Sequence, residues 1–371
     1  MKKNYVLFFL TVALTVLGGG CGANITVYEN TIIQDRGFGS TRRLQLGDTE
    51  GPLFINEICT DDGIETYEFQ ANNSAEIDMP DIVRLDYHLP AFKRNRYMVA
   101  AGKLSSQSIY PVIFDTGANL DAIILQDIHI RENDMATYPL SKSVGPECKM
   151  SLCAIDELSL GDFSIRNYPA ICWGSHVEVK FLGIFPVSRS EQICFPLPLM
   201  RKFKYFKFDN PAKQIEFSAR KSFTPETGQK WHKLPLYYGY SGKNNHRQIL
   251  YTELEVNGNL LRPLFDTGAG LGLVMNRDLW NSVKTDFNEI SRKQEKLILP
   301  YHFNDNTPTC TNFTVEKLEI AGLGMRNAEL LVLPETKSWK KCNSLLGMGY
   351  FADRVVVVDF EKSILWVKDK I

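Results

Sequence analysis

The chain repeats itself, and this duplication limits its possible folds more than any other feature of the sequence. Residues 113–120 read Ile-Phe-Asp-Thr-Gly-Ala-Asn-Leu, and residues 264–271 read Leu-Phe-Asp-Thr-Gly-Ala-Gly-Leu. Three weaker matches follow in the same order. They pair 155–167 with 315–327, 181–184 with 345–348, and 205–217 with 356–366. Four ordered matches predict two homologous lobes, over 85–222 and 230–371.

The apolar pattern indicates that both lobes are mostly β. Short runs of Val, Ile, Leu, Phe and Tyr are bounded by Gly, Pro, Asn and Asp, and few stretches keep a helical period. The first lobe has a longer segment between its apolar-Gly motif and the Asp that follows: 209 − 183 = 26 residues, against 359 − 347 = 12 in the second. This difference predicts a surface excursion around 188–200.

An Asp-Thr-Gly turn that follows an apolar strand becomes chemically interesting when it occurs twice. The strand delivers the carboxylate to a tight turn. Glycine permits backbone angles closed to other residues and lets the opposing chain approach. The threonine hydroxyl is placed to hydrogen-bond to the other lobe. The two turns are Asp115-Thr116-Gly117 and Asp266-Thr267-Gly268.

Asp115 and Asp266 are therefore the candidate catalytic residues. Two carboxylates about 3 Å apart cannot both ionise, so they share one proton. The ionised member acts as a general base on a water, and the protonated member donates to the scissile carbonyl oxygen. This chemistry uses no metal, cofactor or covalent intermediate.

Over most of residues 95–371 this arrangement resembles the aspartic peptidases of the pepsin and retropepsin clan. The resemblance implies two acid-protease-type β-barrel lobes in one chain, with the active-site cleft between them and one aspartate from each lobe. It also implies that a Leu-Gly element supports each Asp-Thr-Gly loop. These elements are Leu182-Gly183 and Leu346-Gly347.

Both motifs depart from the pepsin pattern at the residue after the glycine. Pepsins usually have Ser or Thr there, whereas this chain has Ala118 and Ala269. Alanine has no hydroxyl to donate to a carboxylate, so the charged form is less favoured. We therefore expect a mildly acidic pH optimum.

The resemblance also implies a hairpin, the flap, that closes over the substrate from the first lobe. It is expected within 136–153, with its turn at Gly145-Pro146 or at 149–152. Pepsins carry a Tyr on this hairpin, and Tyr138 is the candidate here. The alternative is that Tyr138 is a strand residue whose ring packs against its neighbours.

The N-terminus has the form of a targeting segment. Lys2 and Lys3 precede an apolar stretch, 5–17, that is too short for a comfortable membrane span. Three glycines then lead to Cys21, which resembles a bacterial lipoprotein signal. That resemblance predicts a signal peptide at 1–20, lipid on Cys21 and an exported chain anchored to the cell envelope. The alternative is a plain secretory signal.

Residues 21–84 match neither repeat, so the sequence leaves open a tether, a removable pro-segment or an extra layer on the first lobe. Seven cysteines remain after Cys21, and at least one must stay unpaired because the number is odd. Cys148 and Cys153 are the simplest local pair. No Cys or His spacing matches a zinc motif.

Composition limits the partners. The 42 Lys and Arg residues nearly balance the 43 Asp and Glu residues, which argues against nucleic-acid binding. No Gly-x-Ser-x-Gly motif occurs. Two functions remain: a monomeric aspartic endopeptidase acting on extended peptide or protein substrates, and, as the alternative, a non-catalytic lipoprotein that binds a peptide or protein. In both, the membrane is reached only through the lipid anchor.

Overall fold

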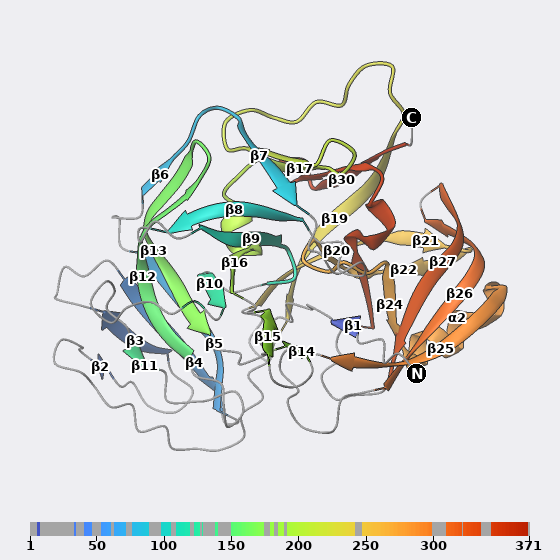
Figure 1. The fold of residues 1–371 in the computed structure, drawn as a ribbon, viewed down its shortest axis with the longest axis horizontal. Coiled ribbons are helices and arrows are strands. Elements are labelled where there is room, and N and C mark those ends of the chain that lie inside the picture. Colours follow the sequence, from blue (N-terminus) through green and yellow to red (C-terminus); the bar gives the residue numbers. More distant parts are fainter. Residues whose placement is uncertain are drawn as a thin grey trace.

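The fold is a computed structural model that is mostly β, as predicted (Figure 1). The residues that it describes are 6–7, 33–34, 41–46, 53–60, 63–71, 76–88, 98–104, 109–118, 122–126, 128, 138–139, 150–173, 179–181, 185–188, 191–241, 247–298, 309–320, 322–334 and 343–369.

The two repeats form two corresponding sets of strands, one on each side of Figure 1. The first lobe contains β6 (Glu76–Asp78), β8 (Val99–Leu104), β9 (Ile109–Asp115), β10 (Ile123–Gln126), β11 (Tyr138–Pro139), β12 (Met150–Leu160), β13 (Phe163–Trp173) and β16 (Gln192–Pro196). The second contains β20 (Arg247–Thr252), β21 (Leu254–Val256), β22 (Asn259–Leu261), β23 (Leu264–Asp266), β24 (Leu273–Asn276), β25 (Glu289–Ile298), β26 (Thr309–Ile320), β27 (Leu323–Leu333) and β28 (Ser344–Gly347).

Helices in the described chain are short. They are α1 (Leu197–Met200), α2 (Arg277–Val283) and the 3-10 turns η1 (Lys284–Asp286) and η3 (Met348–Phe351). Asn276 caps α2 by accepting a hydrogen bond from the backbone N–H of Leu279 at 2.8 Å. None of the described helices is long and apolar enough to cross a membrane.

A six-stranded antiparallel sheet joins the lobes, with three strands from each. In order it contains β7 (Val83–His88), β18 (Gln214–Ser218), β17 (Tyr205–Asp209), β29 (Val355–Asp359), β30 (Ile364–Lys368) and β19 (Trp231–Ser241). The junction is the β17–β29 pair, in which Phe206 lies opposite Val358. The strands on the two sides correspond at a constant offset, 355 − 205 = 364 − 214 = 150.

A buried asparagine adds a polar connection across this junction. Asn210 follows β17, and its side-chain oxygen accepts a hydrogen bond from the Tyr87 hydroxyl at 2.9 Å. Its Nδ2 donates to the backbone oxygens of Phe351 and Arg354 in the second lobe, at 2.7 and 3.1 Å. Because the group is buried, losing either partner would leave a costly unsatisfied amide.

The two lobes fill equivalent cores with different side chains. In the first lobe, phenylalanines of β9, β16, β17 and β18 pack ring to ring, and Phe114 lies 5.3 Å from Phe195 and 5.4 Å from Phe206 between centroids. In the second, aliphatic residues such as Leu318 and Leu346 are completely buried. The two cores therefore differ in residue type at corresponding strands.

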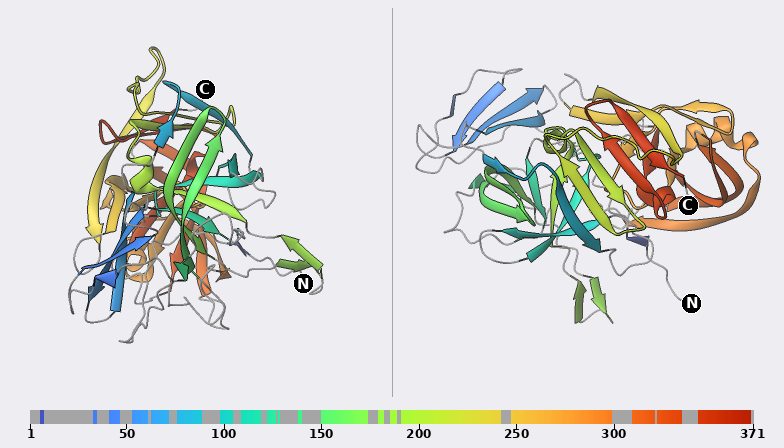
Figure 2. Two further views of the ribbon diagram at one scale, coloured as in Figure 1. Left: turned by 90° about the vertical axis from the view of Figure 1, so that its left-hand side faces the viewer. Right: turned by 90° about the horizontal axis from the view of Figure 1, so that it is seen from above.

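The structure corrects the predicted excursion at 188–200. All five residues of β16 are buried, and so are Leu197, Leu199 and Met200 of α1. The extra length precedes them: β13 and β16 are separated by 192 − 173 = 19 positions, against 344 − 333 = 11 between β27 and β28. This longer connection carries the hairpin β14 (Val179–Phe181) and β15 (Phe185–Ser188), which extends from the body in Figure 2.

The N-terminal part contributes a separate sheet and the start of the first lobe. Strands β2 (Ile33–Gln34), β3 (Thr41–Leu46), β4 (Leu53–Thr60) and β5 (Gly63–Ala71) form a four-stranded sheet beside that lobe (Figure 2). Strand β1 (Val6–Leu7) pairs with β25. Strand β6 pairs with β13, and β7 pairs with β18.

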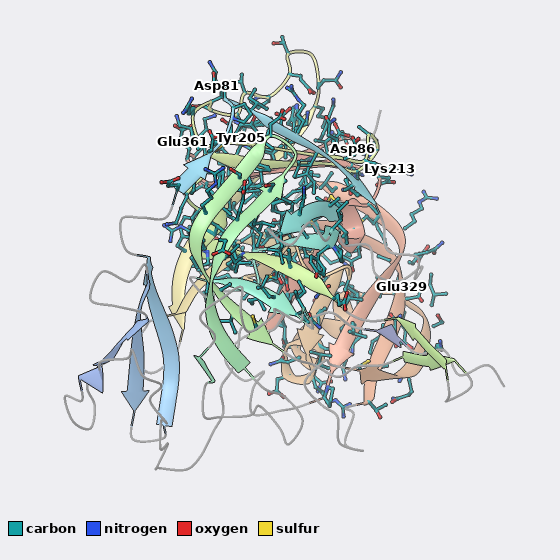
Figure 3. The ribbon with its side chains drawn as sticks, turned by 60° about the vertical axis from the view of Figure 1, so that its left-hand side comes forward. Asp81, Asp86, Tyr205, Lys213, Glu329 and Glu361 are labelled. Carbon is teal, nitrogen blue, oxygen red and sulfur yellow. The ribbon has the colours of Figure 1, made fainter. Side chains whose placement is uncertain are left out.

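One side of the six-stranded sheet carries Tyr205, which is buried with Phe223, Val357 and Trp366, and the exposed Asp86; both Tyr205 and Asp86 are labelled in Figure 3. The Tyr205 hydroxyl donates to Glu216 at 2.8 Å, and Arg84 bonds to the same carboxylate at 2.8 Å. Desolvation and the Glu216 partner raise the pKa of Tyr205. This network ties β7, β17 and β18 together at the surface.

Candidate active site

The two Asp-Thr-Gly turns meet where the lobes join. Strand β9 ends at Asp115 and β23 ends at Asp266, so each strand delivers its carboxylate to the start of a turn. Both aspartates are buried, with 0% and 1% of their surface exposed. The structure therefore brings together the two residues that the sequence singled out.

The threonines of the two turns hold the lobes together symmetrically. The Thr116 hydroxyl donates to the backbone oxygen of Phe265 at 2.7 Å and accepts from the Thr267 N–H at 3.0 Å. The Thr267 hydroxyl donates to the backbone oxygen of Phe114 at 2.6 Å and accepts from the Thr116 N–H at 3.0 Å. Four buried hydrogen bonds thus fix one turn against the other.

Glycine is required in both turns because the opposite carboxylate comes so close. A Cβ on Gly117 would lie 2.6 Å from Oδ2 of Asp266, and one on Gly268 would lie 2.6 Å from Oδ2 of Asp115. Neither glycine has a positive φ in the left-handed region, so the expected need for unusual backbone angles is wrong. What the turns require is space.

Backbone amides orient each carboxylate from within its own turn. Oδ1 of Asp115 accepts from the N–H groups of Gly117 at 2.7 Å and Ala118 at 3.1 Å. Oδ1 of Asp266 accepts from the N–H of Gly268 at 2.8 Å. The second oxygen of each carboxylate is left to face other partners.

The pair is arranged to share a proton. Burial raises the pKa of Asp266 well above its usual value, the charge of Asp115 raises it further, and a hydrogen bond with the Asp115 carboxyl adds to both. The N–H groups of Gly268 and Ala269 act in the opposite direction. Within the described chain, no N–H or O–H donates to Oδ2 of Asp266. A carboxyl–carboxyl hydrogen bond needs one protonated partner, so the pair titrates as a unit.

A parallel strand lies beside each of the two turns. In the second lobe, β28 runs parallel to β23, with Leu346 opposite Phe265 and Gly347 opposite Asp266. In the first lobe the corresponding strand is β16, with Phe195 opposite Phe114 and Pro196 opposite Asp115.

The predicted support Leu182-Gly183 falls on residues between β14 and β15 that the structure does not describe, so it stays a prediction. The position beside Asp115 belongs to Pro196, because the equivalent backbone contacts are made there. Leu197 N–H donates to Ala118 O at 2.9 Å, as Met348 N–H donates to Ala269 O at 2.8 Å.

One residue near the pair was missed by the sequence analysis. Cys194 is a free, buried cysteine of β16, and its Sγ lies 3.8 Å from Oδ2 of Asp115 in a hydrogen bond. Burial raises the pKa of this thiol, and the charges of Asp115 and Asp266 raise it further, so it stays protonated. The sequence signal was the alignment of 193–196 with 344–347, which has the same offset of 151 as the two Asp-Thr-Gly turns.

The other predicted positions lie wholly or partly outside the described residues. Tyr138 lies in β11, which pairs with β12 opposite Leu152. Its side chain is outside the description, as are Gly145, Cys148 and Cys21. The flap, the Cys148–Cys153 pair and the lipidation site therefore stay predictions.

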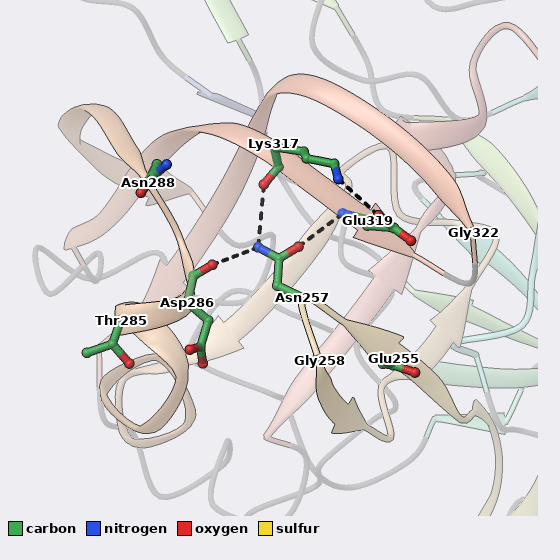
Figure 4. Close-up of a pocket in the computed structure, with 9 residues that line it drawn as sticks. All are labelled: Glu255, Asn257, Gly258, Thr285, Asp286, Asn288, Lys317, Glu319 and Gly322. Atoms are coloured by element: carbon green, nitrogen blue, oxygen red, sulfur yellow. Dashed lines mark hydrogen bonds and ion pairs between the residues drawn. The ribbon is translucent and has the colours of Figure 1, made fainter.

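A polar hollow of about 640 Å³ lies on the second lobe, apart from the aspartates (Figure 4). It is lined by Glu255, Asn257, Gly258, Thr285, Asp286, Asn288, Lys317, Glu319 and Gly322. Asn257 bridges it by donating to Asp286 O at 3.0 Å and accepting from the Glu319 N–H at 3.2 Å. No three acidic, His or Cys side chains of the described ranges are grouped so as to hold a metal ion.

No protein-family model matches the chain, and no curated protein sequence matches it. Among solved structures it is similar to an aspartic proteinase from Irpex lacteus, with 11% identity and a TM-score of 0.43 over 78% of this chain and 97% of that one. It is also similar to basic 7S globulin from soybean, with 12% identity and a TM-score of 0.43 over 78% and 95%. Identities and TM-scores this low do not indicate the chemistry of this chain. The evidence for its chemistry is the set of contacts between the two turns.

Proposed function

We propose that this protein is an aspartic-type endopeptidase and that Asp115 and Asp266 are its catalytic residues. One observation carries the proposal: two buried carboxyl groups, one from each lobe, that face each other at the meeting point of two cross-bonded turns. A turn-capping role for the aspartates would explain their amide contacts. It would not explain why the two carboxyl groups face each other.

The proposed reaction uses the two protonation states of the pair. The ionised carboxylate takes a proton from a water held between the aspartates, and the water oxygen attacks the carbonyl carbon of the peptide bond. The protonated carboxyl donates its proton to the carbonyl oxygen, which gives a neutral tetrahedral intermediate. As this intermediate collapses and the C–N bond breaks, the carboxyl that took the proton from water gives it to the leaving nitrogen, and the other carboxylate takes a proton from a hydroxyl of the intermediate.

We propose that the substrate is an extended peptide or an unfolded segment of a protein. A peptide bound as a strand is held mainly by backbone hydrogen bonds, and alternate side chains enter pockets that set specificity. Both carboxyl groups are almost fully buried in this structure. The same burial favours the alternative candidate, a protein that binds a peptide without cleaving it.

The two candidates are separated by incubating the purified protein, expressed from residue 22, with a diverse peptide mixture between pH 3 and pH 7. Mass spectrometry then identifies any new peptide ends. We expect internal cleavage by the wild type. We expect a loss of at least about 10³-fold in Asp115→Asn and Asp266→Asn, because each variant removes one partner of the proton exchange.

Equal cleavage by the wild type and both variants would mean a contaminating peptidase and would overturn the proposed mechanism. Peptide binding without cleavage at any pH would favour the binding protein. Thermal unfolding of both Asn variants shows whether they fold, since Asn keeps the size of Asp and both turns.

We also propose that the chain is exported and anchored by lipid on Cys21. The support is the sequence before Cys21, with its basic start and apolar stretch. Expression in a bacterial host with a labelled fatty acid should label the wild type, and Cys21→Ala should abolish the label. Equal labelling of both proteins would refute lipidation at this position.

A further inference from the structure

The two aspartates have unequal surroundings, although the lobes that carry them are repeats. Oδ2 of Asp115 accepts a hydrogen bond from the thiol of Cys194, whereas no N–H or O–H of the described residues donates to Oδ2 of Asp266. Hydrogen bonds to a carboxylate favour its charged form. The contacts of the site therefore favour the negative charge on Asp115.

The difference arises from one position of the repeat. Cys194 lies opposite Ile113 in the β16–β9 pair, and Leu345 lies opposite Leu264 in the β28–β23 pair. The offsets are the same for both partners, 345 − 194 = 264 − 113 = 151, so Leu345 is the counterpart of Cys194. The leucine side chain has no hydrogen-bond donor, so the second lobe lacks the hydrogen bond that Cys194 makes in the first.

Among the described residues, few charged groups lie near the thiol. The charged groups that act on Cys194 are Asp115 and Asp266. On neighbouring strands, it faces Ile113 of β9 and Ile124 of β10. The next polar pair along β10 and β16 is Gln126 and Gln192, which are uncharged and hydrogen-bonded to each other. Among these groups, the thiol has one acceptor, the Asp115 carboxylate.

We propose that Cys194 is a positioning residue of the site: its thiol holds Asp115 as the ionised member of the pair and leaves the shared proton on Asp266. This assignment rests on the proposed function, within which Asp115 becomes the general base and Asp266 the acid. The thiol also takes the place of the hydroxyl donor that Ala118 lacks. It acts through Asp115 and does not touch the substrate.

The test compares Cys194→Val, which removes the donor, with Cys194→Ser, which keeps one. In the purified full chain labelled with ¹³Cγ-aspartate, NMR follows the titration of Asp115 and Asp266, assigned with Asp115→Asn and Asp266→Asn. In Cys194→Val we expect Asp115 to titrate at a higher pH, by about half a pH unit, because its charged form loses a weak donor. Cys194→Ser should shift it less.

Leu345→Val is the matched control, since it alters packing at the mirror position without removing a donor. It should lower the melting temperature and leave the titration of Asp115 in place. The inference is overturned if Cys194→Val leaves that titration unchanged. It is also overturned if Cys194→Ser or Leu345→Val moves the titration as far as Cys194→Val does.

The pH dependence of peptide cleavage is a second measurement, and it separates a failure of the proposed function from a failure of the inference about Cys194. In Cys194→Val the acid limb of the kcat/KM profile should move to higher pH by the same amount as the NMR titration. If the wild type cleaves no peptide, the proposed function fails while the NMR result still decides the role of Cys194. If the wild type cleaves and its acid limb is unmoved by Cys194→Val, the inference about Cys194 fails alone.

Discussion

At the scale of single residues, the site depends on how closely two turns approach. Gly117 and Gly268 each leave space for the carboxylate of the other lobe, and Thr116 and Thr267 fix that distance by hydrogen bonds. Their roles are reciprocal, so a change in one turn acts on the aspartate of the other. This makes the turns sensitive to a single added methyl group.

Gly117→Ala and Gly268→Ala should each reduce kcat/KM by about 100-fold or more, because the new Cβ would displace the opposite carboxylate and a shift of about 1 Å can cost that much. Peptide cleavage at the optimum pH measures the loss. The control is Gly324→Ala, where a Cβ meets no atom within 4 Å. Full activity in both turn variants would show that the site tolerates a wider separation.

Asp266→Asn should make the protein more stable than the wild type at neutral pH. The folded-state pKa of Asp266 is raised, so its contribution to stability is complete below the unfolded pKa, near pH 4, and is lost as pH rises through the folded pKa. Asn mimics the neutral form. The advantage of the variant should therefore be small at pH 4 and grow by about 1.4 kcal/mol per pH unit until Asp266 ionises in the folded state.

Urea unfolding of the wild type and Asp266→Asn at several values between pH 4 and pH 8 measures this advantage. Asp162→Asn, at an exposed turn, is the control for replacing an aspartate elsewhere. A difference between Asp266→Asn and the wild type that stays constant across this range would contradict the raised pKa.

At the scale of elements, β16 is the part of the first lobe that supports the site. It lies parallel to β9 and carries both Cys194 and Phe195. Phe195 is completely buried among the rings of Phe114, Phe163 and Phe203. The strand thus connects the aromatic core to the carboxylate of Asp115.

Phe195→Ala should lower the free energy of unfolding by about 3–5 kcal/mol, because it removes a buried ring from a packed cluster. Ile109 is 72% exposed, so Ile109→Ala should change the free energy of unfolding by about 0.5 kcal/mol or less. Urea unfolding of both variants provides the comparison. A small loss in Phe195→Ala would contradict the placement of β16 in the core.

At the scale of the whole molecule, the lobes depend on each other. The six-stranded sheet is divided between them at the β17–β29 pair, and Asn210 and the two threonines add buried hydrogen bonds across the same junction. Separating the lobes would expose a paired strand edge and apolar side chains to water. Neither lobe is a self-contained unit by this criterion.

Residues 224–371 expressed alone should therefore fail to fold, and coexpression with residues 22–223 should restore a native complex. Two-dimensional amide NMR of labelled 224–371 measures both states. We expect poorly dispersed signals alone and dispersed signals with the partner fragment. A dispersed spectrum from 224–371 alone would show that its own core is sufficient.

The sequence by itself determined the duplication, the mostly β fold and the two turns that carry the aspartates. These features are legible because they are local: an apolar strand, a polar turn and a repeat of both need no knowledge of distant contacts. The same holds for Leu346 and Gly347, which do lie beside Phe265 and Asp266. Here the repeat and its structural role coincide.

Only the tertiary structure decided which strand supports Asp115. A Cβ on Gly347 would lie 2.5 Å from Ala269 O, so glycine is needed there, and its N–H donates to Gly272 O at 2.9 Å. In the first lobe this place is taken by Pro196, which has a Cβ and no N–H. A search of the sequence for an apolar-Gly pattern therefore does not identify the strand beside Asp115. The folded chain also decides the burial of the two aspartates and the contact of the Cys194 thiol with Asp115. Cys194 and Asp115 are 79 positions apart in the sequence, so only the tertiary structure brings them together.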